Sequence, residues 1–171
     1  SMDLYEKWVE YLLEYGSDPK EQLCTDDFAG HLAHNVNLAI KAIMGGESYS
    51  ILLKAAGRNE EAKEFHQKAA RMAEEVYAGS KAGDHTKLTF DGPDESGSLK
   101  YNAVWDLLFG SELWPGCFYE QELSYYEGKQ NDYGIPLDSR NTYTKSEWIM
   151  WCAAMSDKPE KVELVAERIL R

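Results

Sequence analysis

The spacing of apolar residues along the first half of the chain predicts three amphipathic helices. The first, LYEKWVEYLLEYG at 4–16, places apolar side chains at steps of three and four before a glycine stop. A longer helix is expected over 34–57, where Gly45 and Gly46 indicate close helix packing or a kink. A third helix is expected over 59–79, with acidic residues in its first turn. Helix therefore dominates this half.

A polar stretch at 80–99, rich in Gly, Asp and Ser, separates these helices from the second half. Only TKLTF alternates like a strand, so we expect a long loop with one short hairpin or strand near 86–90. Helical spacing returns in YNAVWDLLFG, PGCFYEQELSYYEGK, KSEWIMWCAAMS and KPEKVELVAERILR. The pattern predicts an all-α fold of paired antiparallel helices in a single domain over 1–171.

The charge of the chain narrows the classes of partner. Eighteen basic residues face thirty acidic ones, for a formal net charge of -12. Phosphate backbones and anionic lipids would be repelled, so we expect neither a nucleic-acid nor a membrane partner. The residues show no run of 18 apolar positions and no basic region followed by an apolar stretch. We therefore expect no transmembrane helix and no signal peptide within them.

The first of three polar segments is QLCTDDFAGHLAHN at 22–35. Asp26 suits a helix N-cap as well as it suits a catalytic carboxylate. If the segment is helical, four polar residues share one face. These residues are Asp27, His31, His34 and Asn35. Such a face could bind substrate, form hydrogen bonds inside the core, or hold a metal. The HxxH spacing with one carboxylate is a weak zinc pattern, so we predict no metal and no cofactor.

The second polar segment, KYNAVWD at 100–106, brings Lys100, Tyr101 and Asp106 to the start of a predicted helix. The third, NDYGIPLDSRNTYTKSEW, is longer than a helix connection needs, and long loops on rigid scaffolds tend to carry function. Within it, an arginine beside a carboxylate can orient that carboxylate or bind a substrate carboxylate, as Arg140 beside Asp138 would. An ordinary loop ion pair is the alternative.

The helix after the third segment is expected to begin with a capping box. Thr144 and Glu147 have the spacing of that motif, in which each side chain bonds a backbone N–H at the helix start. We therefore assign these two residues a structural role.

The polar segments also resemble a known family. QLCTDDFAGHLAHNVNLAIKAIMG, the GDHTKLTFD loop, KYNAVWDLLFG and YYEGKQNDYGIPLDSRNTYTKSEWIMW resemble, in order and spacing, the central helical region of the glutaminase A family. The resemblance covers about 4–156. It implies part of an (α/α)6 toroid, the six-hairpin glycosidase-like fold. It also implies hydrolysis of the side-chain amide of glutamine by secreted, periplasmic or cell-envelope proteins.

Two positions depart from the family pattern. DESGSL stands before KYN, where the family usually has Trp-Ser or Trp-Gly, and this difference could alter one wall of a pocket. Glu147 stands where the family usually has Asp before Trp, which leaves the expected helix cap in place.

The residues and the resemblance together predict the helical domain of a glutaminase A-like hydrolase. The predicted catalytic carboxylates are Asp26, Asp27 and Asp138. The predicted substrate-binding residues are His31, His34, Asn35, Lys100, Tyr101, Asp106 and Arg140. A glycoside hydrolase acting on a carbohydrate is one alternative, because five Trp and eleven Tyr suit stacking on sugars. A non-catalytic accessory domain is the other.

About seven helices cannot close a toroid of twelve. We therefore expect apolar helix faces that the missing half of the toroid covers, or that drive self-association. Part of a ring supplies only part of a central pocket, so we expect little or no activity from these residues alone. The expected ligand of the complete site is a small molecule or a carbohydrate.

Overall fold

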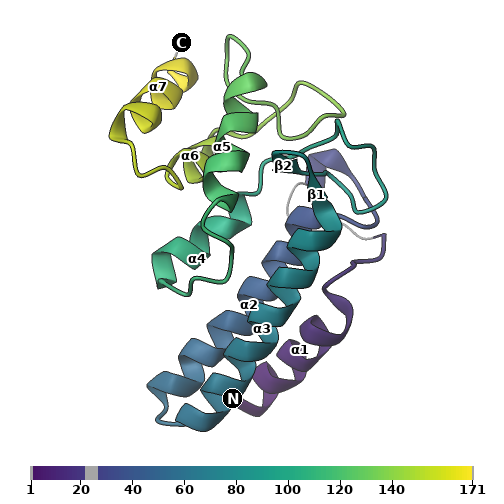
Figure 1. Ribbon diagram of the computed structural model, residues 1–171, viewed down its shortest axis with the longest axis vertical. Helices are drawn as coiled ribbons and strands as arrows, with labels where there is room; N and C mark the ends of the chain where they lie inside the picture. Colours follow the sequence, from purple (N-terminus) through teal and green to yellow (C-terminus); the bar gives the residue numbers. More distant parts are fainter. Residues whose placement is uncertain (1, 22–26, 171) are drawn as a thin grey trace.

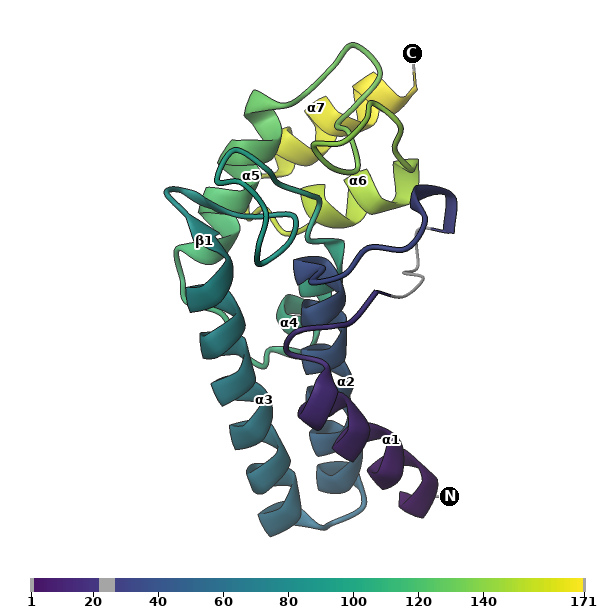
Figure 2. The ribbon, with the colours of Figure 1, turned by 90° about the vertical axis from the view of Figure 1, so that its right-hand side faces the viewer.

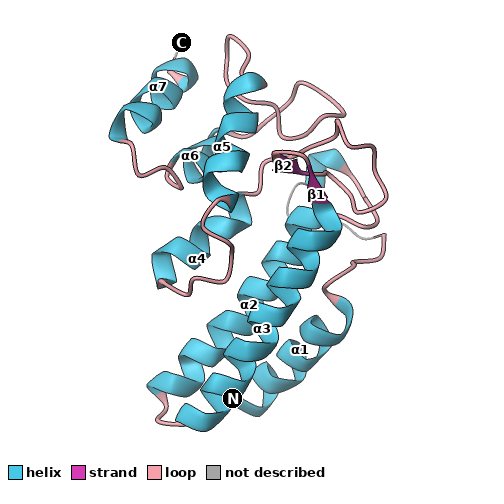
Figure 3. Cartoon of the chain, viewed as in Figure 1, coloured by secondary structure: helices cyan, strands magenta, loops and turns pink. Residues whose placement is uncertain are grey.

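The computed structural model describes residues 2–21 and 27–170, and helices dominate it (Figure 3). The described α-helices are α1 (Met2–Tyr15), α2 (Val36–Ala55), α3 (Asn59–Ser80), α4 (Val104–Phe109), α5 (Phe118–Gly128), α6 (Ser146–Ala153) and α7 (Pro159–Ile169). Two short 3-10 helices are η1 (Asp27–Ala29) and η2 (Tyr101–Ala103). Each helix in this part of the chain is too short or too polar to cross a lipid bilayer. The predicted all-α fold class is confirmed.

A small antiparallel hairpin joins β1 (Lys81–Ala82) to β2 (His85–Thr86). Gly83 lies in its turn with φ of 62°, a left-handed conformation that glycine adopts without steric cost. The turn therefore forms at Gly83, and the hairpin begins a few residues before the predicted 86–90. Farther along this stretch, Thr89 forms an isolated bridge with Asn35.

The helices α2 and α3 form a long antiparallel pair, and α1 packs against α2 (Figures 1 and 2). A Cβ atom on Gly45 would lie 2.7 Å from Leu12 Cδ1, and one on Gly46 would lie 3.1 Å from Leu13 Cδ2. The glycine pair therefore allows the close approach of α1, while α2 continues through it as an unbroken helix. This confirms the prediction of close packing at these two residues.

The second half of the chain packs at the end of the pair where α2 begins and α3 ends (Figure 2). Tyr101 of η2 stacks on Trp148 of α6, with ring centroids 4.2 Å apart and an angle of 7° between the rings. Apolar side chains of α2, α3, α5 and α6 belong to one core, which includes Ile43, Val76 and Phe118. The polar loops between these helices are therefore held on a packed base.

Two helices at the edges expose apolar side chains. On α1 these are Leu4, Tyr5, Trp8, Tyr11 and Tyr15. On α7 none of the residues is buried, and its exposed apolar side chains include Leu164. What covers these faces in the complete protein stays a prediction.

The segment that precedes α2 differs from its prediction. Asn35 is the N-cap of α2, and its side chain accepts a hydrogen bond of 3.0 Å from the Leu38 N–H. Gly30 and His34 have φ of 76° and 60°, and such left-handed residues end a helix. The shared helix face predicted for Asp27, His31, His34 and Asn35 is therefore wrong.

The predicted capping box is also wrong. The N-cap of α6 is Lys145, which makes no side-chain capping bond, and the Thr144 hydroxyl has no partner among the described residues. The Leu137 N–H donates to the Tyr143 carbonyl at 2.9 Å. Lys145 is extended, with φ of -126° and ψ of 133°, and as the N-cap it leaves Thr144 one residue before the capping position.

Candidate functional site

Polar segments distant in sequence meet near the first turn of α2. Residues 97–99 run beside 137–139, with Leu99 N–H donating to the Leu137 carbonyl at 2.8 Å and Ser139 N–H donating to the Gly97 carbonyl at 3.0 Å. The Arg140 guanidinium reaches the first segment and donates from Nη1 to the Ala29 carbonyl at 3.4 Å. These bonds bring parts of the first and third predicted polar segments together with residues 97–99, which directly precede the second.

Asp138 and Arg140 form the ionic centre of this region. The Arg140 Nε–H donates to Asp138 Oδ1 at 3.0 Å, and Nη2–H donates to Oδ2 at 2.8 Å. The backbone N–H of Arg140 adds a third bond to Oδ1, at 2.9 Å. The Asp138 side chain is only 3% exposed, whereas that of Arg140 is 33% exposed. The carboxylate is therefore held in one orientation by a two-pronged, charge-assisted contact.

A cavity of about 530 Å³ opens beside this pair. Its size lies within the range of roughly 300–1,000 Å³ that is typical of small-molecule sites. Its lining includes Ser98, Tyr125, Asn131, Asp138, Arg140 and Thr142. A second cavity of about 10 Å³, close to the size of one water molecule, lies between Asn35, Asn37, Asp138 and Arg140. The Asp138 carboxylate thus borders both spaces.

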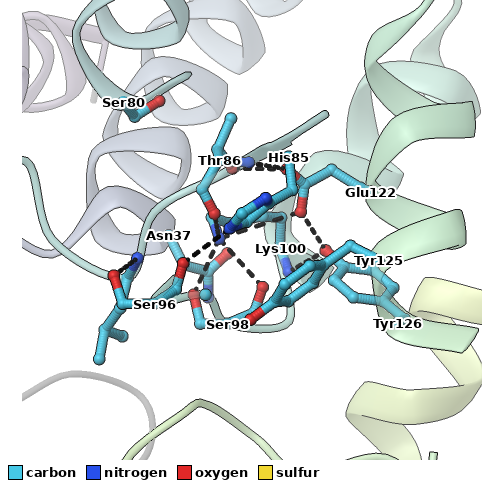
Figure 4. A network of polar contacts seen from close by, with 12 residues as sticks. Asn37, Ser80, His85, Thr86, Ser96, Ser98, Lys100, Glu122, Tyr125 and Tyr126 are labelled. Carbon is cyan, nitrogen blue, oxygen red and sulfur yellow. Dashed lines mark hydrogen bonds and ion pairs between the residues drawn. The ribbon is translucent and has the colours of Figure 1, made fainter. Parts of the chain in front are cut away.

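Lys100 lies behind this cavity and does not border it. Its side chain is 0% exposed, and Nζ donates to the Thr86 carbonyl at 3.2 Å and to the Ser98 carbonyl and hydroxyl, both at 3.0 Å (Figure 4). Burial lowers the pKa of Lys100, an effect that the nearby carboxylate of Glu122 opposes. The structure therefore gives Lys100 an internal set of partners in place of contact with a ligand.

Two other predicted substrate-binding residues also have internal partners. Tyr101 is buried in its stack on Trp148. Asp106 is buried and accepts hydrogen bonds from the Leu113 N–H at 2.9 Å and from the Tyr119 hydroxyl. Burial and the Asp106 carboxylate together raise the pKa of Tyr119. These contacts join η2 to α6 and α4 to α5. Neither residue borders the two cavities around Asp138.

The remaining predicted residues lie before α2. Asp26 lies outside the described residues, and Asp27 is described only as the backbone start of η1. His31 is exposed. His34 Nδ1 lies 2.7 Å from Asp18 Oδ1, and the His34 side chain is 42% exposed. Among His31, His34 and Asn35, Asn35 is the one that borders a cavity, as part of the smaller one.

The contact between His34 and Asp18 carries a prediction about titration. The hydrogen bond that the Asp18 carboxylate accepts from the His34 ring is the largest of the effects that raise the pKa of His34 above its ordinary value of 6.5. Because the folded pKa is the higher one, the contact stabilises the fold fully below the unfolded pKa and is lost as pH rises through the folded pKa. We expect Asp18→Asn to lower the His34 pKa in an NMR titration. An unchanged value would contradict the contact.

A larger hollow of about 960 Å³ lies elsewhere, between α1 and the first half of α2. Its lining includes Tyr11, Leu12, Tyr15 and Lys41. None of the residues around Asp138 contributes to it. The cavity beside Asp138 is the better candidate site, because a buried carboxylate and several polar side chains converge there.

Comparison with known proteins gives the family. Residues 1–171 match the family described as "Glutaminase A six helical-hairpin domain". The chain belongs to this family. It is 34% identical over 156 residues to a protein named "Glutaminase A" from Aspergillus oryzae, an alignment that covers 89% of the chain. It is 31% identical over 194 residues to a protein named "Probable glutaminase" from Arthroderma benhamiae, covering 96% of the chain. No solved structure matches the chain.

The two relatives are much longer than this chain. The chain spans 22% of the length of each of these two proteins. The predicted membership of the glutaminase A family is confirmed, and the family description agrees with the all-α helix pairs.

Some residues of this family member were not predicted as part of the site. Three of them, Ser98, Tyr125 and Asn131, border the cavity of about 530 Å³ beside Asp138. Glu122 is buried behind that cavity. The string YYEGKQN, which carries part of the family resemblance, contains Tyr125 and Asn131 and was the available signal for those two. Glu122 lies four residues from both Phe118 and Tyr126, so helical spacing places it on their buried face, and this spacing was the available signal for it.

Proposed function

We propose that this chain forms one side of the substrate site in a glutaminase A-like hydrolase that cleaves the side-chain amide of glutamine. The observation that carries the proposal is the Asp138 carboxylate, buried and clamped by Arg140 beside a cavity of about 530 Å³. The names of the two relatives support the choice of glutamine. Because the chain covers only 22% of those proteins, other parts of the full-length protein would complete the site.

The reaction sets requirements for the site. Water adds its oxygen to the amide carbon, the C–N bond breaks, and a proton from the water goes to the leaving nitrogen, which gives glutamate and ammonia. A positioned acceptor for the water and donors for the oxyanion would lower the barrier. Asp138 Oδ2 accepts one hydrogen bond from the described residues, and a carboxylate oxygen can accept two. We assign Asp138 the role of holding and polarising the water.

The role of Arg140 in this proposal is to orient Asp138. Its Nε and Nη2 both face the carboxylate, so a substrate carboxylate that used this fork would have to displace Asp138. Orientation by a fixed donor pair suits a group that must meet a water molecule at a defined position. The earlier expectation that Arg140 receives the substrate carboxylate is therefore the weaker of the two roles.

The names of the two relatives favour amide hydrolysis, and glycoside hydrolysis would need a second carboxylate from another part of the full-length protein. Glycosidases of the usual type place two carboxylates on either side of the scissile bond, about 5–9.5 Å apart. Among the described residues that border the cavity of about 530 Å³, Asp138 is the one carboxylate. A single clamped carboxylate is sufficient to hold a water molecule for attack on an amide.

The test is a comparison of substrates on the full-length protein. We expect ammonia release from L-glutamine, a much lower rate with L-asparagine because its amide lies one methylene closer to the α-carbon, and no sugar release from oligosaccharides. The assay combines ammonia detection with chromatography of the sugars. Sugar release without ammonia would replace the proposal with the glycosidase alternative.

A glycine at the rim of the cavity gives a further prediction. A Cβ atom on Gly97 would lie 2.5 Å from Tyr125 Cε1, and the Tyr125 ring is stacked on His85 with centroids 4.1 Å apart. Gly97→Ala must therefore displace an aromatic wall of the cavity. We expect KM for glutamine to rise by roughly an order of magnitude, equivalent to about 1.4 kcal/mol.

The matched control for this substitution is Gly128→Ala at the end of α5, where an added Cβ meets no atom within 4 Å. We expect its KM to match that of the unaltered protein in steady-state kinetics. Equal KM values for the two variants would show that the Tyr125 wall does not contact the substrate.

A further inference from the structure

A buried polar network lies behind the cavity and includes two ionisable side chains that the proposed reaction does not use. Glu122 of α5 is 1% exposed, and its Oε2 lies 4.0 Å from Lys100 Nζ (Figure 4). The backbone N–H and the hydroxyl of Thr86 both donate to Glu122 Oε1 at 2.6 Å. The Tyr126 hydroxyl donates to Oε2 at 2.9 Å. Both oxygens of the buried Glu122 carboxylate therefore have partners inside the protein.

Lys100 connects this network to the wall of the cavity. Two of the three acceptors of its ammonium group, the carbonyl and the hydroxyl oxygen, belong to Ser98. The third, the Thr86 carbonyl, belongs to the residue that also binds Glu122. The backbone N–H of Lys100 donates to the Tyr126 hydroxyl at 2.8 Å. The Lys100 side chain thus joins Ser98 to Thr86, and its ammonium group lies 4.0 Å from Glu122 of α5.

Ser98 in turn lies beside Asp138. The two residues form an isolated antiparallel bridge, and backbone bonds of 2.8 and 3.0 Å on either side join 97–99 to 137–139. The order of contacts therefore runs from Glu122 and Thr86 through Lys100 to Ser98, and from there to the segment that carries Asp138. The side chains along this series are all buried: Glu122, Thr86, Lys100, Ser98 and Asp138.

We propose that Lys100 is a positioning residue, which fixes the Asp138 carboxylate at the cavity by holding Ser98 and, through it, the segment 137–139. Lys100 touches neither cavity, so it acts through other residues and does not contact the substrate. The effect of Lys100 on catalysis rests on the proposed function of Asp138. The effect of Lys100 on the position of the segment 137–139 is independent of that function.

The test uses the full-length protein with two substitutions made together, Lys100→Met and Glu122→Gln. Changing both removes both buried ionisable groups, so neither is left unpaired, and the amide introduced by Glu122→Gln keeps an acceptor for Thr86 and offers a donor to Tyr126. All side chains that border the cavity stay unchanged. We expect kcat for glutamine to fall roughly tenfold with KM changed by less than about twofold, because the water-holding group is misplaced while the substrate pocket is retained.

A second readout does not depend on turnover. Hydrogen exchange of the peptide covering 136–142, followed by mass spectrometry, reports the backbone bonds that hold Asp138 in place. We expect faster exchange of this peptide in the double variant and in Ser98→Ala, which removes one of the acceptors of Lys100. Adding Ser98→Ala to the double variant should lower kcat little further, because both changes break the same link.

The matched control is Thr86→Val, which deletes a buried hydroxyl from the same network on the side away from Asp138. We expect unchanged kcat and unchanged exchange of 136–142 in this variant. If the control changes both readouts as the double variant does, or if the double variant changes neither, the positioning role is overturned. If the unaltered protein releases no ammonia from glutamine, the proposed function fails, and the exchange result alone decides the role of Lys100.

Discussion

Asp138→Asn in the full-length protein is expected to lower kcat for glutamine by about 10²–10⁴-fold, the range typical of removing a positioned acid–base group. The carboxylate is 3% exposed, borders both cavities and is held by three donors from Arg140. Asparagine keeps one acceptor oxygen but loses the negative charge, and its amide group turns a donor toward a donor of Arg140. Steady-state ammonia release measures kcat, and circular dichroism establishes that the variant is folded.

The control for this substitution is Glu61→Gln. Glu61, in the first turn of α3, also accepts hydrogen bonds from both Nε and Nη2 of an arginine, Arg58. Arg58 lies in the connection between α2 and α3, at the end of this helix pair that is far from the cavity (Figure 1). Glu61→Gln therefore loses the same kind of ion pair without touching the site. We expect its kcat to match that of the unaltered protein. A folded Asp138→Asn protein with an unchanged rate would reduce Asp138 to an ordinary loop ion pair.

Lys100→Met alone is expected to destabilise the protein by about 3–5 kcal/mol, the usual result of removing one partner of a buried ionic pair. The Glu122 carboxylate would remain 1% exposed, without the nearby ammonium group. The loss of the three Lys100 donors also leaves the Thr86 and Ser98 carbonyls without these bonds. Denaturant unfolding of the full-length protein, followed by tryptophan fluorescence, measures the change.

Two further variants separate the buried charge from the loss of packing. Lys68→Met removes a partly exposed lysine that pairs with Glu64 one helical turn away, and it should cost less than about 1 kcal/mol. Adding Glu122→Gln to Lys100→Met removes the unpaired charge, so part of the lost stability should return. If the single and double variants at positions 100 and 122 have equal stability, the carboxylate at Glu122 is not the cause of the loss.

The helices were predictable because their pattern is local. The apolar stripe of a helix repeats every three or four residues, so the sequence alone places α1, α2 and α3 to within a few residues. The pairing of Asp138 with Arg140 is local in the same sense, since the two residues lie two positions apart and the backbone N–H of Arg140 shares the carboxylate. The family could also be identified from the sequence, because long polar strings carry the resemblance.

Long-range contacts decided the rest, and no spacing along the chain encodes them. Lys100 looked like a ligand-binding residue at a helix start, but its amine is buried against Thr86 and Ser98. Glu122 shares a helix face with Phe118 and Tyr126, but its partner, the backbone of Thr86, lies 36 residues earlier in the chain. The apolar stripe of a helix shows which of its sides is buried. Which residues pack against that side depends on how distant segments of the chain fold together. That packing decides which polar residues border the cavity and which ones hold its wall.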